Sequence, residues 1–220
     1  MNAVLTGPYL ALIGRGLMAT LLISGFVIVV SNMAALVIAI YMLRARPALG
    51  PLIVAYSFFA RAAPALAILF VLYYGLPRVG IYLDPLSSAL IGLTFASSAY
   101  NYEFLRSGFA AIPVSQREAA EALGLRRGTI LRKVLLPQAY ATAAPALFSN
   151  AIQMVKGSSL ASLVAIDELT AAATTITAET YKAIEVLLTI SVFYLLIAGV
   201  ILRLQYLYEY SLKWRRLARH

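Results

Sequence analysis

Three ionisable residues, Arg61, Glu103 and Lys156, lie inside long apolar stretches of the chain. A charge inside a membrane-spanning helix costs about 2.5–3.5 kcal/mol on insertion scales, so such residues are candidates for function. A cation and an anion along one path could bind the carboxylate and the ammonium group of a zwitterion. Alternatively, Arg61 and Glu103 pair across helices or extend toward the membrane surface and hold a helix bundle together. Arg61 could also face a neighbouring subunit.

Polar and helix-breaking residues accumulate on both sides of Lys156. Irregular backbone at membrane depth is tolerated only where it is buried in protein or lines a cavity. We therefore expect this segment to face a translocation path. The alternative is close helix packing, which small residues also mediate. The residues concerned are Pro145, Asn150, Gln153, Lys156, Gly157, Ser158 and Ser159.

The composition indicates an integral membrane protein. Of 220 residues, 62% are hydrophobic and only 12% are charged, about half the charged fraction of a soluble domain. Apolar runs of about 20 residues are what a helix needs to cross a bilayer. The sequence predicts a single all-α domain over residues 1–220, an integral membrane helical bundle of about five transmembrane helices. The expected spans are 17–43, 51–76, 86–108, 138–166 (broken at Pro145 and Gly157) and 184–208.

The sequence lacks the residues that several classes of function require. There is no cysteine, and the single histidine, His220, is the last residue. No phosphate-binding Gly-x-x-x-x-Gly-Lys-[Ser/Thr] motif occurs, no acidic and histidine cluster has metal-ligand spacing, and no serine has a plausible base. We therefore expect neither catalysis nor a cofactor in this polypeptide. The net charge of +9 lies at span ends rather than on a nucleic-acid surface, so no nucleic-acid partner is expected.

The distribution of positive charge predicts an orientation. Cationic residues concentrate on the cytoplasmic side of membrane proteins. This rule places residues 115–137 and the C-terminus in the cytoplasm and the N-terminus outside. One side collects Arg44, Arg46, Arg117, Arg126, Arg127, Arg132, Lys133, Lys213, Arg215, Arg216 and Arg219; the other collects Arg15, Arg78 and Lys182 with Asp84, Asp167, Glu168 and Glu179.

Residues 115–137 form the most polar segment between the expected spans. Ser115 followed by Glu118 predicts a capping box that starts a helix, and Gly124 can end it in a left-handed conformation. A second helix is expected at about 128–136, with Pro137 in the first turn of the next span. One interpretation is an amphipathic loop on the membrane surface. The other, which we favour, is a helix–turn–helix that docks against a soluble partner.

This segment resembles the EAA loop of ABC importer permeases through Glu118-Ala119-Ala120, Gly124 and Leu136-Pro137. The similarity covers about residues 17–210, and within the importer permeases it is to the polar amino acid uptake family. That family has an Arg-Gly-Thr-Pro element, in which this chain has Ala62 and Ala63 at the two middle positions. Permeases for methionine or quaternary amines share the loop but lack much of the Ser-Ala-Tyr stretch. The further matching residues are Arg61, Pro64, Ser98-Ala99-Tyr100, Glu103, Arg106, Gly108, Pro113, Gln138-Ala139, Pro145, Asn150, Lys156, Ser159-Leu160 and Glu185.

The resemblance implies a permease subunit of an ATP-driven importer for amino acids or similar polar solutes. Its partners would be a cytoplasmic ATPase dimer that binds ATP and magnesium, a second permease chain, an extracytoplasmic substrate-binding protein and the lipid of a bacterial inner membrane. The resemblance implies coupling to the ATPase through Glu118, Ala119, Ala120, Leu123, Gly124, Arg126 and Pro137. It implies a substrate path along Arg61, Ser98, Tyr100, Glu103, Asn150, Gln153, Lys156, Gly157 and Ser158.

One departure from the family concerns residue 157. Many amino acid permeases of this kind carry an acidic residue after the lysine, suited to a substrate ammonium, and this chain has Gly157. Either the substrate is held differently, or this chain is the non-binding half of a heterodimeric pore, which we favour. The alternatives from other classes are an ion-coupled secondary transporter or exporter without an ATPase and a membrane anchor that recruits a soluble partner.

Overall fold

The computed structural model describes residues 7–43 and 48–217, and these fold into helices without a strand, which confirms the all-α class. Arg44, Arg46 and Arg219, on which the expected orientation partly rests, lie outside the described residues. The helices are α1 (Gly7–Met42), α2 (Gly50–Ala62), α3 (Ala65–Phe70), α4 (Pro85–Ala110), α5 (Val114–Ala122), α6 (Arg127–Ile130), α7 (Leu136–Gly157), α8 (Leu169–Thr180) and α9 (Ala183–Leu217). Shorter π and 3₁₀ turns extend three of them: Val71–Gly75 and Leu76–Val79 follow α3, Leu131–Leu135 follows α6, and Ser158–Val164 follows α7.

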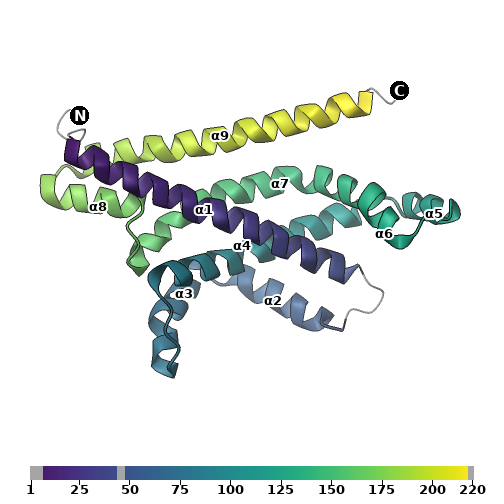
Figure 1. Cartoon of the computed structure of the whole chain (residues 1–220), viewed down its shortest axis with the longest axis horizontal. Helices are drawn as coiled ribbons and strands as arrows, with labels where there is room; N and C mark the ends of the chain where they lie inside the picture. Colours follow the sequence, from purple (N-terminus) through teal and green to yellow (C-terminus); the bar gives the residue numbers. More distant parts are fainter. Residues whose placement is uncertain (1–6, 44–47, 218–220) are drawn as a thin grey trace.

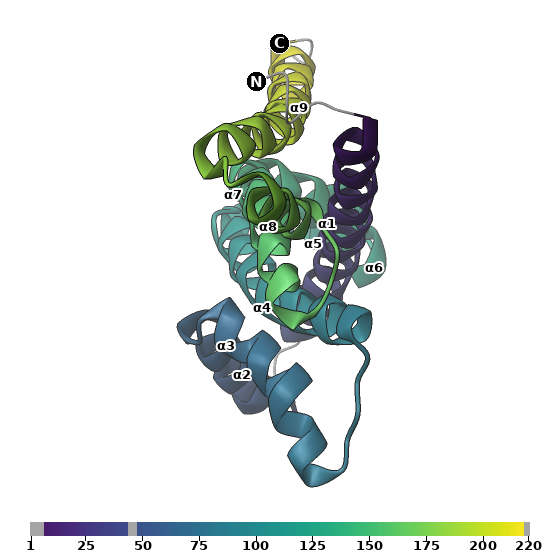
Figure 2. The ribbon, with the colours of Figure 1, turned by 90° about the vertical axis from the view of Figure 1, so that its left-hand side faces the viewer.

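Helices α1, α4 and α7 form the centre of the bundle, with α2 and α3 on one side and α8 and α9 on the other (Figures 1 and 2). The start of α1 and the end of α9 lie at opposite ends of the molecule (Figure 1). The α5–α6 hairpin projects beyond the end of the bundle that is remote from α8 (Figure 1). The core positions along α1 are small or branched, as in Ala35, Ala39 and Val27, and this lets neighbouring helices approach closely.

Helices α4 and α7 cross closely at Gly108. A Cβ built on Gly108 would overlap with the carbonyl oxygen of Ala139. Glycine is therefore required here by the crossing of two helix backbones, and no side chain can replace it without separating them. Gly92 on α4 has a similar position against the side chains of Leu69 and Leu72.

By length and composition, α1 and the part of α9 from Ala183 to Leu212 are long and apolar enough to cross a membrane. Counting each of two bent helix pairs as one span raises the number to four. The predicted count was about five. The helix missing from this count is α4, whose bounds agree with the expected span 86–108. Its buried face carries serines and Asn101, because it packs against other helices rather than lipid.

The segment expected to span the membrane at 51–76 is bent rather than a straight helix. Helix α2 ends at Ala62, and the chain turns by 105° before α3 and its extension to Val79. Pro64 follows in extended backbone, and its preceding residue Ala63 is extended as well (ψ 136°). Proline disfavours helical backbone in the residue before it, which explains the break. Arg61 therefore lies in the last turn of a short helix rather than in the middle of a long one.

The predicted break at Pro145 is also wrong, since α7 runs through this residue to Gly157. Neighbouring helices and local adjustment can compensate the hydrogen bond that a proline removes within a membrane helix. The helix does change after Gly157, where it tightens into the 3₁₀ turn Ser158–Val164. The pair formed by residues 127–164 and α8 is bent by 55°.

Two further boundaries differ from the sequence prediction. The capping box at Ser115 is absent: α5 already begins at Val114, with Pro113 at the N-cap and no side-chain cap. The second helix of the hairpin does not end before Pro137 but continues into α7 through the π turn Leu131–Leu135, where the N–H of Leu136 bonds to the carbonyl of Leu131. Pro137 cannot donate the next helical hydrogen bond, and the wider π turn directly before it keeps the helix continuous.

Candidate translocation path and coupling hairpin

The α5–α6 hairpin is built around Gly124. The backbone of Gly124 has φ +71°, as the sequence predicts. The N–H of Leu125 bonds to the carbonyl of Ala120 (3.2 Å), and the N–H of Gly124 bonds to that of Glu121 (2.9 Å). This pair of bonds is a Schellman motif, which closes a helix with a left-handed residue and usually needs glycine there. The turn therefore fixes the angle between the two helices of the hairpin.

The predicted coupling residues line this hairpin and are mostly exposed. Glu118, Ala119, Leu123 and Arg126 are exposed, Leu123 by 79%, whereas Ala120 is buried. Arg126 is the N-cap of α6, and Pro137 lies in the first turn of α7. The exposed side chain of Leu123 at the tip of the hairpin is thus available to a partner surface.

One side-chain hydrogen bond joins α5 to the bundle: Gln138 on α7 donates to Gln116 (3.2 Å). The Arg117–Glu121 pair (2.9 Å) lies within α5 and stabilises that helix alone. The covalent connection is stronger, because α6 continues as helix into α7. From Arg127 to Gly157 this forms one rod about 45 Å long at about 1.5 Å per residue.

The structure brings Arg61 and Glu103 together, as the pairing alternative expected. Glu103 Oε2 accepts from Arg106 (2.7 and 2.9 Å), Glu103 Oε1 accepts from Ser57 Oγ (2.9 Å), and Arg61 Nη2 lies 3.9 Å from Oε1. Sequence reasoning singled out neither Ser57 nor the Arg106 pairing. Two arginines share one carboxylate, so this cluster joins α2 to α4 and keeps one positive charge in excess.

Ser98 and Tyr100 of the expected path contact the same two helices. The hydroxyl groups of Tyr56 and Ser98 are 2.6 Å apart. Tyr100 Oη donates to the carbonyl oxygen of Arg61 (3.1 Å), which has lost its helical partner at the bend before Pro64. Both hydroxyl groups thus stabilise the broken α2–α3 segment within this chain. Their contribution to a solute path stays a prediction.

Asn150 lies in a buried polar network at the centre of the bundle. Its Nδ2 donates to Ser97 Oγ (2.9 Å) and to Asn101 Oδ1 (2.8 Å). Ser31 Oγ accepts from both Ser97 Oγ (3.0 Å) and Asn101 Nδ2 (3.2 Å). The network therefore ties α1, α4 and α7 together. This geometry agrees with the packing alternative for Asn150.

Replacing Asn150 by leucine is expected to destabilise the protein by about 1–2 kcal/mol, because Ser97 and Asn101 each lose an interhelical partner. The measurement is the midpoint of thermal inactivation in detergent. Ser149→Ala, at the exposed neighbouring position, serves as the control. An unchanged midpoint combined with a changed solute affinity would instead assign Asn150 to the path.

The remaining path residues divide between a cavity and the protein interior. Ser158 is buried and bonds to the carbonyl of Val155 (2.7 Å), Gly157 is half-buried, and Gln153 and Lys156 are exposed. Lys156 lines a cavity of about 470 Å³ between α7, α8 and α9. Sequence reasoning missed the residues of α8 and α9 that share this cavity, because nothing in their spacing relates them to Lys156. They are Thr170, Ala173, Leu187, Ile190, Ser191, Tyr194, Leu195 and Ala198.

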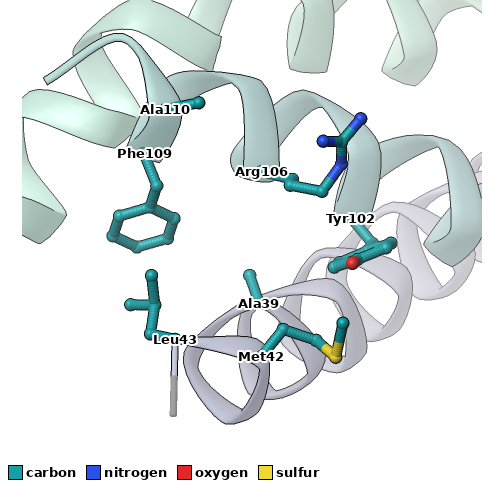
Figure 3. Close-up of a pocket in the computed structure, with 7 residues that line it drawn as sticks. All are labelled: Ala39, Met42, Leu43, Tyr102, Arg106, Phe109 and Ala110. Atoms are coloured by element: carbon teal, nitrogen blue, oxygen red, sulfur yellow. The ribbon is translucent and has the colours of Figure 1, made fainter. Parts of the chain in front are cut away.

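A second cavity, of about 290 Å³, lies between α1 and α4 near the hairpin end (Figure 3). Met42, Leu43 and Phe109 face it, while the guanidinium group of Arg106 points away from them (Figure 3). Arg106 is engaged with Glu103 as described above. Because Arg106 is engaged, the lining offers a zwitterion no free charged group, which distinguishes this cavity from the one at Lys156.

Comparison with known families identifies this architecture. Residues 31–213 match the family described as the binding-protein-dependent transport system inner membrane component. The chain belongs to this family. It is thus a membrane-embedded permease component, with apolar helices that suit an inner membrane.

Named relatives of this permease come from several bacteria. It is 35% identical over 171 residues to YckA of Bacillus subtilis (strain 168), described as a probable amino-acid ABC transporter permease protein; the match covers 76% of this chain and 73% of YckA. It is 33% identical over 162 residues to PatM of Vibrio harveyi, which has the same description, with 72% and 73% covered.

Solved structures agree with the fold of the permease. A chain of an amino acid ABC transporter crystallised with histidines has a TM-score of 0.84 and 28% identity, covering 93% of this chain and 95% of that one. A chain of the MetNI methionine ABC transporter in an inward-facing conformation has a TM-score of 0.79 at 21% identity, covering 94% and 99%, and shares the fold.

Proposed function

We propose that this permease is the membrane-spanning subunit of an ATP-driven ABC importer for amino acids or similar polar solutes. The relatives named above are described as probable amino-acid ABC transporter permeases, and the amino acid transporter chain aligns along nearly its whole length. The observation that carries the proposal is the α5–α6 hairpin, exposed at its tip and continuous with α7. An ion-coupled transporter would have no use for such a hairpin.

The hairpin inserts into a groove on a cytoplasmic ATPase subunit. Glu118 and Leu123 provide contacts on its exposed side, and Gly124 sets its angle. ATP, with magnesium, binds and is hydrolysed on that partner, and this chain supplies no catalytic group. When the ATPase dimer closes, the displaced hairpin moves the helical rod formed by α6 and α7, and Lys156 near the far end of the rod moves with it.

The permease lies in a bacterial inner membrane with its N-terminus outside and the hairpin and C-terminus in the cytoplasm. The hairpin carries Arg117, Arg126 and Arg127, whereas α8 at the other end has Asp167 before it and Glu179 in its last turn. Lipid covers the outer side of α1 and the exposed apolar side chains of α9 that do not line the cavity at Lys156. A second permease chain, which we take to be a different one, completes the pore, and an extracytoplasmic binding protein delivers the solute.

The solute contacts the cavity beside Lys156, whose ammonium group would bind its carboxylate. Gln153 and Gly157 adjoin Lys156 on α7, and the apolar residues of α9 cover the other side of the cavity. Arg61 and Glu103 are already paired and hydrogen-bonded, so their contribution is to hold α2 against α4. This division gives Arg61, Glu103 and Lys156 distinct parts.

The first test is to express the tagged chain with its chromosomal neighbours and to identify what co-purifies by native mass spectrometry. An ATPase with a second, different permease chain supports the importer and the heterodimer. An ATPase with two copies of this chain supports the importer and rejects the heterodimer. A folded preparation without any ATPase, or uptake abolished by collapsing the proton gradient at constant ATP, would contradict the importer.

A further inference from the structure

Glu168 is a fully buried carboxylate that neither the coupling hairpin nor Lys156 contacts directly. Its exposed fraction is 0%, and it lies where α1, α8 and α9 meet. No lysine or arginine lies within ion-pair distance of it among the side chains that the structure describes. A buried charge without a counter-ion persists only if hydrogen-bond donors surround it, and four donors do so here.

The two oxygens of Glu168 have different partners. Oε1 accepts from the backbone N–H groups of Thr170 (2.8 Å) and Ala171 (2.9 Å), so it caps the N-terminus of α8. Oε2 accepts from Tyr194 Oη on α9 (2.8 Å) and from Thr20 Oγ1 on α1 (3.3 Å). A cap alone needs one oxygen. The second oxygen is therefore available to fix the hydroxyl group of Tyr194.

The hydroxyl groups of Tyr194 and Thr170 form a relay from Glu168 to the cavity at Lys156. Tyr194 Oη and Thr170 Oγ1 are 3.0 Å apart, and both residues line that cavity. A tyrosine carries a single hydroxyl proton. Because Tyr194 donates it to Glu168, the proton between the two hydroxyl groups must come from Thr170. The oxygen of Thr170 can then only accept further hydrogen bonds.

Ser159, which also lines this cavity, has the same polarity. Its hydroxyl group donates to the carbonyl oxygen of Lys156 (2.6 Å), so its oxygen is also left as an acceptor. The cavity thus combines one cationic group, Lys156, with hydroxyl oxygens that accept hydrogen bonds. Such a site is complementary to a carboxylate and to an N–H donor on one solute, and no side chain at position 157 is needed.

We infer that Glu168 is a positioning residue that makes the Thr170 and Tyr194 wall of this cavity a subsite for the ammonium group of an amino acid. The carboxylate sets the direction of the hydroxyl protons, and its negative charge favours a cation nearby. The inference rests on the proposed importer function. It also means that this chain binds solute itself. Many amino acid permeases of the family that it resembles carry an acidic residue at the position of Gly157, and the proposed subsite does not need one.

The test uses the complete transporter, with its ATPase, second permease chain and binding protein, in proteoliposomes. The probes are L-glutamine, L-arginine, L-glutamate and L-cystine, and for any that is transported, its desamino analogue. Tyr194→Phe removes the relay and frees the Thr170 proton, and Glu168→Gln replaces one acceptor by a donor. Both are expected to raise KM for the amino acid about tenfold, with a smaller change in kcat. Both should also reduce the preference for the amino acid over the desamino analogue.

Thr175→Val, on the side of α8 away from the cavity, is the matched control and should leave KM unchanged. If the Glu168→Gln protein does not accumulate, KM and the preference over the desamino analogue are measured for Tyr194→Phe and Thr170→Val instead. Unchanged KM and unchanged preference in these two variants would overturn the inference, even if their thermal stability falls. Absence of ATP-driven uptake of every probe by the wild-type complex would instead contradict the importer for amino acids, so the two failures are distinguishable.

Discussion

Gly124→Val is expected to lower ATP-driven uptake by at least about tenfold while the protein still inserts in normal amounts. The residue has φ +71°, and a left-handed conformation costs about 1–2 kcal/mol with a Cβ and more with a branched one. Nothing lies within 4 Å of the position of that Cβ, so the effect comes from backbone conformation alone. The Schellman turn would open and misdirect the exposed tip of α5. The measurements are uptake and solute-stimulated ATP hydrolysis in proteoliposomes.

Two variants separate this cause from a general effect of substitution in the hairpin. Gly128→Val adds the same side chain four residues later, where φ is not positive and no atom is close, so uptake should be nearly normal. Gly124→Asn should retain most of the uptake, because asparagine tolerates left-handed backbone. Normal uptake by Gly124→Val would refute coupling through this turn.

Gly108→Val is expected to destabilise the permease by about 3 kcal/mol or more, at the upper end for overpacked sites. The added carbon would overlap with the carbonyl oxygen of Ala139, and a backbone atom cannot move aside as a side chain does. Helices α4 and α7 would separate and disturb the Asn150 network that joins them. The midpoint of thermal inactivation in detergent should fall by roughly 10 °C.

Gly25→Val provides the control for this substitution. Gly25 is exposed on α1 and nothing lies within 4 Å of its added Cβ, so the midpoint should hardly change. A Gly108→Val protein as stable as the wild type would show that the α4–α7 crossing is not the fixed centre of the bundle. Reduced transport at normal stability would point to the same conclusion.

The sequence was sufficient for the features that depend on local patterns. Long apolar runs predicted the helices α1 and α9, because a helix facing lipid must be apolar over its whole length. The bounds of α4 and the left-handed turn at Gly124 were also predictable. The motif residues from Glu118 to Pro137 indicated the permease family, which the comparisons confirm. They also indicated a coupling hairpin, whose coupling role stays a prediction. Each of these signals is contained within a short stretch of chain.

Other features arose only from contacts between distant residues. Proline was not a reliable indicator: Pro64 coincides with a break, whereas α7 continues through Pro145, because the outcome depends on whether neighbouring helices support the interrupted turn. The Asn150 network needs Ser31, more than a hundred residues earlier. Glu168 likewise contacts Thr20 and Tyr194 from other helices, and the spacing of these residues in the sequence does not predict the contacts.

The sequence by itself thus determined the class, the family and the hairpin, since hydrophobicity and turn chemistry act within one or two helical turns. Tertiary structure decided which polar groups serve packing and which line a cavity. A helix of this composition can place a given side chain toward lipid, a neighbour or a path, and only the packing of α4, α7, α8 and α9 fixes which. Lys156 acquired its hydroxyl-lined cavity, and Asn150 its buried partners, from that packing alone.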